Sequence, residues 1–261
     1  MLAGSRGAST PLKLENTQVM GGWAVHARDQ ASVTVRNSEG IGAGIHLGRL
    51  PDLIEGMRPG HHAFWALRSD QDSPGLGNLT LINTSVAFWD LNLSMRANPI
   101  TLRRCVTNLW IWDTRATIRL EDTTLNGFSA ANSQLVFECA SAALVYGFQL
   151  DDSRLSIRGL FSSSMADPKL VMNSSVVDRE YPITVLDRSG QPARGVAVRV
   201  EDPLGRIITY TADQDGVARF TIWFFDATYD KTWHLLVPQG ETTTRIPIAL
   251  LTSTPVQVTS W

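Results

Sequence analysis

Leu79-Thr-Leu81-Ile-Asn83-Thr84 is one copy of a phrase that recurs along the first two thirds of the chain. In each copy two apolar residues flank a single intervening residue, and small or polar residues follow soon after. Apolar side chains at every second position are typical of a β-strand with one buried face. The phrase therefore predicts short strands, which begin at Leu12, Val33, Leu79, Ile100, Ile118, Leu135, Leu155 and, in a degenerate copy, Leu170.

The spacing of these strands is nearly regular. Successive copies begin 21, 46, 21, 18, 17, 20 and 15 residues apart. A repeat of about 20 residues, with no helical pattern between the strands, is typical of a solenoid. We predict a coil whose turns stack in parallel, with one extra irregular turn and a loop inside the 46-residue interval.

This register predicts which side chains of adjacent turns are neighbours. The residues between the apolar pairs point outward, so Arg103 should lie beside Glu121, and Glu138 beside Arg158. Asparagine tolerates the left-handed backbone conformation of a tight corner. We therefore expect a corner at each of Asn16, Asn37 and Asn83.

The repeats resemble the right-handed parallel β-helix family with pectate-lyase-like repeats, over about residues 10–177. That family includes lyases, hydrolases, epimerases, adhesins and inert surface proteins. The resemblance therefore implies an architecture without choosing an activity.

The pattern of residues along the sequence changes near Asp178. Strands separated by Asp, Pro and Gly turns at about 10-residue spacing are typical of an antiparallel sandwich. The stretches Val185–Val198 and Thr211–Phe220 resemble the carboxypeptidase-regulatory-like or transthyretin-like Ig-type module, which in that family is a non-catalytic extracellular spacer or assembly unit. We predict an all-β protein with a right-handed parallel β-helix over residues 1–177 and an Ig-like β-sandwich over residues 178–261.

Composition excludes several classes of partner. A net charge of −2 favours neither nucleic acid nor an anionic membrane, and no apolar run is long enough to span a bilayer. No signal peptide is visible, which suggests a mature or excised segment of an extracellular or cell-envelope protein. Cys105 and Cys139 should lie two turns apart, at roughly 9–10 Å, so we expect two buried free thiols rather than a disulfide.

Aromatic residues recur about ten residues after the start of several phrases: Trp23, Trp89, Trp110, Phe128 and Tyr146. The favoured interpretation is a second inward-facing strand whose rings stack in the core. The alternative is an exposed platform on which sugar rings stack. Trp110 and Trp112 share one face of a strand and Leu109 and Ile111 the other, so the two tryptophans are the best carbohydrate-binding candidates.

Acidic residues near these tryptophans are the candidates for carbohydrate chemistry. Asp90 and Asp113 complete the candidate carbohydrate-binding set, and Asp151 and Asp152 partly share their face. Enzymes that cleave polysaccharides need clustered acids, and no compact set is evident. Solvated turn residues are therefore the favoured interpretation of these acids, and we name no catalytic residue.

No metal or cofactor is expected. His61-His62 lacks an adjacent third ligand. Asp213-Gln-Asp215-Gly216 resembles the opening of a calcium loop, but it also fits an ordinary hairpin turn. Four sequons make glycosylation candidates of Asn78, Asn83, Asn92 and Asn173.

Two functional hypotheses remain open. The first is a non-enzymatic structural or adhesive surface protein that associates with itself or with neighbouring surface proteins, for example in a layer, sheath or filament. Open solenoid ends expose strand edges, and no clear cap precedes Leu12. The second is a polysaccharide-binding or polysaccharide-degrading β-helix protein.

Overall fold

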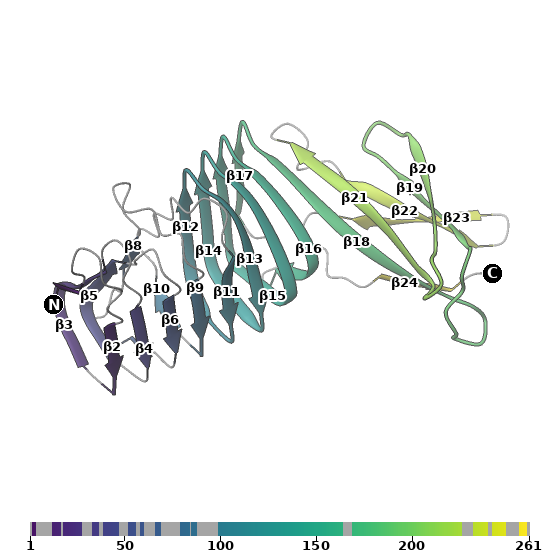
Figure 1. The fold of residues 1–261 in the computed structure, drawn as a ribbon. Coiled ribbons are helices and arrows are strands. Elements are labelled where there is room, and N and C mark those ends of the chain that lie inside the picture. Colours follow the sequence, from purple (N-terminus) through teal and green to yellow (C-terminus); the bar gives the residue numbers. More distant parts are fainter. Residues whose placement is uncertain are drawn as a thin grey trace.

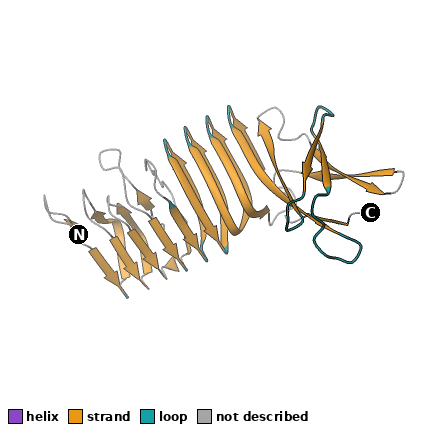
Figure 2. Cartoon of the chain, turned by 45° about the vertical axis from the view of Figure 1, so that its right-hand side comes forward, coloured by secondary structure: helices purple, strands orange, loops and turns teal. Residues whose placement is uncertain are grey.

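The computed structural model describes residues 99–163, 169–225, 232–239, 242–248 and 256–259 and, before these, residues 2–3, 12–16, 18–27, 33–36, 39–46, 52–55, 58–59, 66–68, 79–83 and 85–87. Within these residues every regular element is a strand (Figures 1 and 2). The protein is all-β, and residues 80–179 form a β-solenoid of about four turns. The predicted all-β solenoid is thus confirmed in this part of the chain.

The first wall of the solenoid is a ladder of parallel strands. In ladder order these are β2 (Leu12–Glu15), β4 (Val33–Arg36), β6 (Asp52–Glu55), β9 (Leu79–Ile82), β11 (Ile100–Arg103), β13 (Arg115–Glu121), the first half of β15 (Gln134–Asp151), β16 (Arg154–Ser163) and the start of β18 (Val176–Leu186). Figure 1 shows these strands stacked along the length of the coil.

The second wall is also parallel. It runs through β10 (Ser85–Ala87), β12 (Val106–Trp112), β14 (Thr123–Ala131), the second half of β15 and β17 (Lys169–Asn173). Nearer the N-terminus a separate parallel sheet contains β1 (Leu2–Ala3), β3 (Gln18–Ala27), β5 (Glu39–His46), β7 (Arg58–Pro59) and β8 (Ala66–Arg68). Each turn therefore contributes one strand to each of two walls.

Alternation along the strands creates the core between the walls. In β11 and β13 the apolar residues of the repeated phrase, such as Ile100 and Ile118, are completely buried, whereas their neighbours are partly or fully exposed. Between the walls the ring of Phe128 packs 5.0 Å from Phe137 and 6.5 Å from Phe148, measured between centroids. Such pairs prefer tilted or edge-to-face geometry, which these rings adopt.

The corners of the coil are formed by residues in the left-handed backbone region. Asn16 and Asn83 have φ near +50°, as expected from the sequence, and Asn37 lies outside the described residues. Arg104, Asp113, Asp122, Asn132, Asp152 and Ser174 occupy later corners in the same conformation. Several of these residues donate their backbone N–H to a carbonyl one turn on, as Asp113 does to Ala131 at 3.0 Å; the others are Asn16, Asn83, Arg104, Asn132 and Asp152.

At one corner of the coil, buried hydroxyl groups of successive turns are connected by a ladder of hydrogen bonds. The backbone N–H groups of Thr114, Ser133 and Ser153 each donate to the hydroxyl of the next turn at 3.0–3.1 Å, and the ladder ends at Ser175. Each serine hydroxyl in turn donates at 2.7 Å to the carbonyl two residues before it. The backbone groups of this corner are therefore satisfied without water.

The 46-residue interval contains one additional strand of the first wall. Strand β6 lies between β4 and β9, with Leu53 opposite both Thr34 and Thr80. This confirms the predicted extra turn, whose strand in the first wall is Asp52–Glu55.

Two details of the predicted register are wrong. Phe137, not Leu135, lies opposite Ile118, because this turn is two residues longer than the phrase count assumes. The Leu170 phrase forms β17 in the second wall, opposite Phe148, while β18 continues the first wall.

The ion pairs follow this corrected register. Arg103 pairs with Glu121 at 2.7 Å, as predicted. Glu138 lies opposite Arg158, also as predicted, but it also lies opposite Arg119 and forms its ion pair with that residue, at 3.0 Å. Ion pairs this exposed to solvent contribute little to stability, so they indicate the register of the strands more than they stabilise the fold.

Both cysteines are buried and free, which confirms the predicted absence of a disulfide. Cys105 lies at a corner, where its thiol contacts the carbonyls of Leu81 and Arg103 at 3.4 and 3.2 Å. Cys139 lies within β15 opposite Leu120, and burial raises its pKa to about 12.

The C-terminal part is joined to the solenoid by one continuous strand. Strand β18 begins in the first wall and continues through Leu186, where it pairs with β21 (Val217–Phe225) in antiparallel and with β24 (Val256–Thr259) in parallel orientation. The boundary predicted between residues 177 and 178 therefore lies inside a strand. An antiparallel sheet of β20 (Ile207–Thr211), β19 (Ala197–Glu201), β22 (Trp233–Gln239) and β23 (Thr242–Ile248), in that order, makes up the rest.

Three turns of the form Asp-x-x-Gly shape this part. They are Asp187–Gly190, Asp202–Gly205 and Asp213–Gly216. In each turn the Asp side chain accepts backbone N–H groups two and four residues on, and the glycine has φ between +71° and +81°. These are the turns that the sequence predicted from Asp and Gly.

A buried arginine lies where the two parts meet. Arg179 is 0% exposed, donates to the carbonyl of Phe161, and places its guanidinium carbon 4.7 Å from the centroid of the Tyr181 ring. Burial lowers the pKa of Arg179 and raises that of Tyr181 to about 12. The cation packs against an aromatic face, an arrangement that favours arginine in desolvated places.

Candidate functional site

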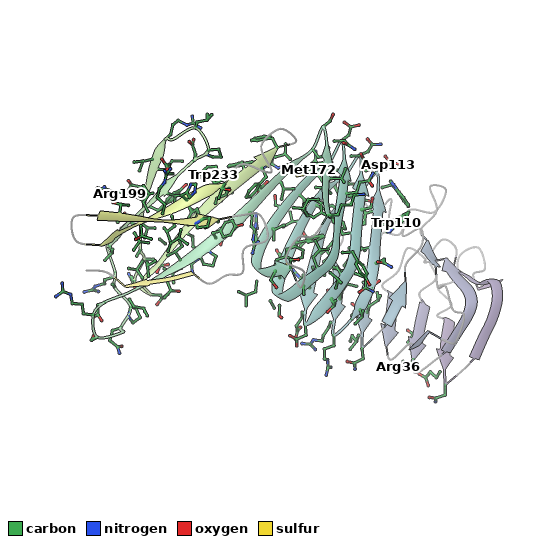
Figure 3. The ribbon with its side chains drawn as sticks, turned by 180° about the vertical axis from the view of Figure 1, so that it is seen from behind. Arg36, Trp110, Asp113, Met172, Arg199 and Trp233 are labelled. Carbon is green, nitrogen blue, oxygen red and sulfur yellow. The ribbon has the colours of Figure 1, made fainter. Side chains whose placement is uncertain are left out.

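The outer face of the second wall carries the tryptophans. Leu109 and Ile111 are at most 1% exposed inside the coil, so the alternation of β12 turns Trp110 and Trp112 outward, where both are half-buried. Their ring centroids are 5.9 Å apart and their planes meet at 79°. Figure 3 shows Trp110 on the outside of the solenoid wall.

The register of the wall places specific residues beside these rings. On the turns that follow, Trp110 is aligned with Ser129, Gln149 and Val171. Trp112 is aligned in the same way with Ala131, Asp151 and Asn173. Small residues on β14 therefore separate the two tryptophans on β12 from polar side chains on β15.

This arrangement forms a groove of about 590 Å³. Gly127 and Ser129 line its floor, Trp110 and Trp112 line one wall, and Gln149 and Asp151 line the other. Neighbouring strands are about 4.8 Å apart, so walls on β12 and β15 are roughly 10 Å apart. Such a width accepts a single flat ring or an extended chain in single file.

The polar wall is held in place by hydrogen bonds. The Gln149 amide donates to one oxygen of Asp151 at 2.9 Å, and the Asn173 amide donates to the other at 2.5 Å. Two donors on two oxygens fix the orientation of the carboxylate while leaving acceptor capacity for a ligand hydroxyl.

Two further residues at the groove are not in the predicted carbohydrate-binding set, although Tyr146 is one of the recurrent aromatics. Tyr146, with 67% of its surface exposed, and Lys169 both line it. Lys169 lies opposite Gly147, whose φ of +140° and missing side chain allow the two backbones to approach closely. Both positions follow from the pairing of β14, β15 and β17 in the second wall, which the spacing of the repeated phrase did not predict.

The favoured interpretation of the recurrent aromatics is therefore wrong for two of them. Phe128 stacks in the core as expected, but Trp110 and Tyr146 point outward, and Phe148 takes the inward position opposite Phe128. A bulge between Leu125 and Gly127 shifts the pairing by one residue, so a constant offset from the phrase does not follow the inner face. The side chains of Trp23 and Trp89 lie outside the described residues.

Of the candidate acids, one lies at the groove and others lie at corners of the coil. Asp151 lines the groove, whereas Asp113 is an exposed corner residue with φ of +50° and is not part of the lining. Asp152 occupies the corresponding corner two turns later. Asp90 lies outside the described residues. Trp110, Trp112 and Asp151 thus line one groove, and Asp113 does not. Figure 3 shows where Trp110 and Asp113 lie.

The sequons differ in their surroundings. Asn83 is exposed at its corner, and Asn173 is exposed while donating to Asp151. Asn78 and Asn92 lie outside the described residues, so glycosylation stays a prediction at all four positions.

The described residues contain no group of three His, Cys, Asp or Glu side chains placed to hold a metal ion, and His61-His62 lies outside them. The Asp213 carboxylate accepts the N–H groups of Asp215 and Val217 and pairs with Arg219, as in a hairpin turn. In the same part of the chain no helix is long and apolar enough to cross a membrane.

Comparisons of the chain with protein-family models, with curated proteins and with solved structures find no match. The chemistry of the groove is therefore argued from its own residues.

Proposed function

We propose that this is a non-enzymatic adhesive protein of the cell surface or envelope that binds a polysaccharide in the groove beside Trp110 and Trp112. The observation that carries the proposal is the pair of outward tryptophans next to an oriented carboxylate. Two neighbouring indoles that are partly exposed on one face form an apolar surface, and apolar patches on a protein surface favour the binding of a ligand.

The groove suits a sugar chain in three respects. Indole faces stack on the apolar C–H face of a pyranose ring. Asp151 and Gln149 offer an acceptor and an amide to the hydroxyls at the ring edge, and Asn108 lines the groove as a further amide. The groove is open rather than enclosed, which suits a chain that continues at both ends.

The number of carboxyl groups that line the groove favours binding without cleavage. Glycoside hydrolysis ordinarily requires two carboxyl groups about 5–10 Å apart, flanking the scissile bond. Among the described lining residues Asp151 is the acidic one, and both of its oxygens are already hydrogen-bonded.

The first prediction concerns the tryptophans. Replacing Trp110 or Trp112 by Ala removes a stacking surface, and each change should weaken polysaccharide binding about tenfold, which corresponds to roughly 1.4 kcal/mol. Calorimetric titration with a panel of neutral and acidic polysaccharides measures this loss.

The matched control is Trp223→Ala. Trp223 is 39% exposed on β21, beneath the guanidinium of Arg154, and does not line the groove. Equal binding by the wild type and both groove variants would refute the proposal. Release of reducing or unsaturated ends during incubation would instead support the degradative alternative.

Self-association is a second candidate function, and an exposed edge strand favours it. Strand β20 pairs with β19 alone among the described strands and carries exposed apolar side chains. Such an edge is a template for pairing with another chain.

A further inference from the structure

The outer edge of β20 differs from the other edge of the same four-stranded sheet. At the far edge, β23 contains Arg245 and Pro247, which are residues that protect an edge against pairing. Strand β20 reads Ile207-Ile-Thr-Tyr-Thr211, with neither charge nor proline. Ile207 is 58% exposed and Ile208 36% exposed, on opposite faces. Figure 1 shows β20 at the border of this sheet.

The hydrogen-bond pattern shows which backbone groups face outward. The N–H of Asp202 donates to the carbonyl of Arg206, and that of Ala212 to the carbonyl of Val196, both at 2.9 Å. Antiparallel pairing alternates, so the even-numbered residues of β20 bond to β19. The N–H and C=O groups of Ile207, Thr209 and Thr211 therefore point away from the sheet.

We propose that the protein forms a dimer in which β20 of two copies pairs in antiparallel orientation about a two-fold axis at Thr209. This interface rests on the self-association proposed above and names its surface. It would join the two four-stranded sheets into one continuous sheet across the dimer.

The strand is complementary to itself in this register. Thr209 lies opposite Thr209 of the second copy, and Ile207 lies opposite Thr211, so the outward backbone groups pair completely. On the inner face Ile208 lies opposite Tyr210 of the second copy. In the monomer Tyr210 is partly buried against Phe220, with ring centroids 5.4 Å apart. Ile208, on the same face of the strand, is exposed to solvent. The second copy of Tyr210 would cover that isoleucine.

No charge opposes a like charge in this pairing, because residues 207–211 are uncharged. Aromatic and β-branched residues paired across strands stabilise a sheet beyond the hydrogen bonds themselves. A second copy of this chain therefore satisfies both the backbone and the exposed side chains of β20.

The test is the mass of the full chain in solution, measured by sedimentation over a wide range of concentrations. The wild type should reach the mass of two chains. Ile207→Lys places a charge at the edge and should raise the dissociation constant at least about tenfold. Thr209→Pro removes the N–H at the two-fold axis without breaking a bond to β19, and should have the same effect.

Thr244→Lys on β23 is the matched control, since Thr244 is also exposed on an edge strand, and it should dimerise as the wild type does. Unchanged circular dichroism and thermal midpoint would show that the variants are folded. A wild type that keeps the mass of one chain would refute both the interface and self-association. A self-associating wild type whose assembly is unaltered by Ile207→Lys would refute the interface alone.

Discussion

At the scale of single residues, backbone conformation limits the sequence most strongly where two turns nearly touch. Gly159 has φ of +85°, and a Cβ built on it would lie 2.1 Å from the carbonyl oxygen of Cys139. No side chain fits there without moving one turn of the coil away from the next. Glycine is therefore required by the stacking as well as by its own dihedral angle.

The effect of this close approach can be measured by comparing substitutions at two glycines with positive φ, Gly159 and Gly205. Gly159→Ala should lower the free energy of unfolding by about 3 kcal/mol or more, since the strain of positive φ and the overlap with the next turn add together. Gly205→Ala shares the positive φ, at +81°, but has open space around it, so it should cost only about 1 kcal/mol. Urea denaturation measures both values. Similar losses in the two variants would show that the overlap is relieved without cost.

At the scale of elements, the Asp-x-x-Gly turns depend on charge. The N–H of Val217, the Arg219 side chain and the N–H of Asp215 hold the pKa of the Asp213 carboxyl below its ordinary value, against a smaller opposing effect of desolvation. A depressed pKa in the folded state contributes stability above the pKa of the unfolded chain. That contribution is lost as the pH falls through the folded pKa.

Asp213→Asn should therefore destabilise the protein at neutral pH and make progressively less difference below about pH 4, the ordinary range of an aspartate pKa. Thermal unfolding of both proteins as a function of pH measures the difference. Asp215→Asn is the control, because Asp215 contributes its backbone N–H to the turn. A difference that stays constant into acid would mean that the charge of Asp213 is not what stabilises the turn.

At the scale of the whole molecule, the C-terminal part covers the end of the solenoid. Strand β21 pairs with β18 where β18 is still the last strand of the first wall, and places Phe224, completely buried, opposite Val177. The edge of the first wall is thereby covered at this end by a strand from the next part of the chain.

Phe224→Ala should cost about 3–5 kcal/mol through the cavity it creates, and should increase hydrogen exchange in β16 as well as in β21. Its neighbour Phe225 is 47% exposed, and Phe225→Ala should leave exchange in β16 unchanged. Faster exchange confined to β21 would show that the cap and the solenoid open independently.

The sequence predicts the architecture well because its signals are local. Alternation in Ile100–Arg103 specifies a strand, and a left-handed residue such as Asn83 specifies a corner, whatever the rest of the chain does.

The candidate site was only partly predictable. Trp110 and Trp112 follow from alternation within one strand, but their neighbours depend on pairing between strands.

By itself, then, the sequence determined that the chain is built from strands in a repeating coil and that two tryptophans share a face. Only the tertiary structure decided that this face is the outer one, and that Asp151 rather than Asp113 stands beside it. The physical reason is register. One bulge, such as that between Leu125 and Gly127, leaves every local preference intact and still changes which side chains meet.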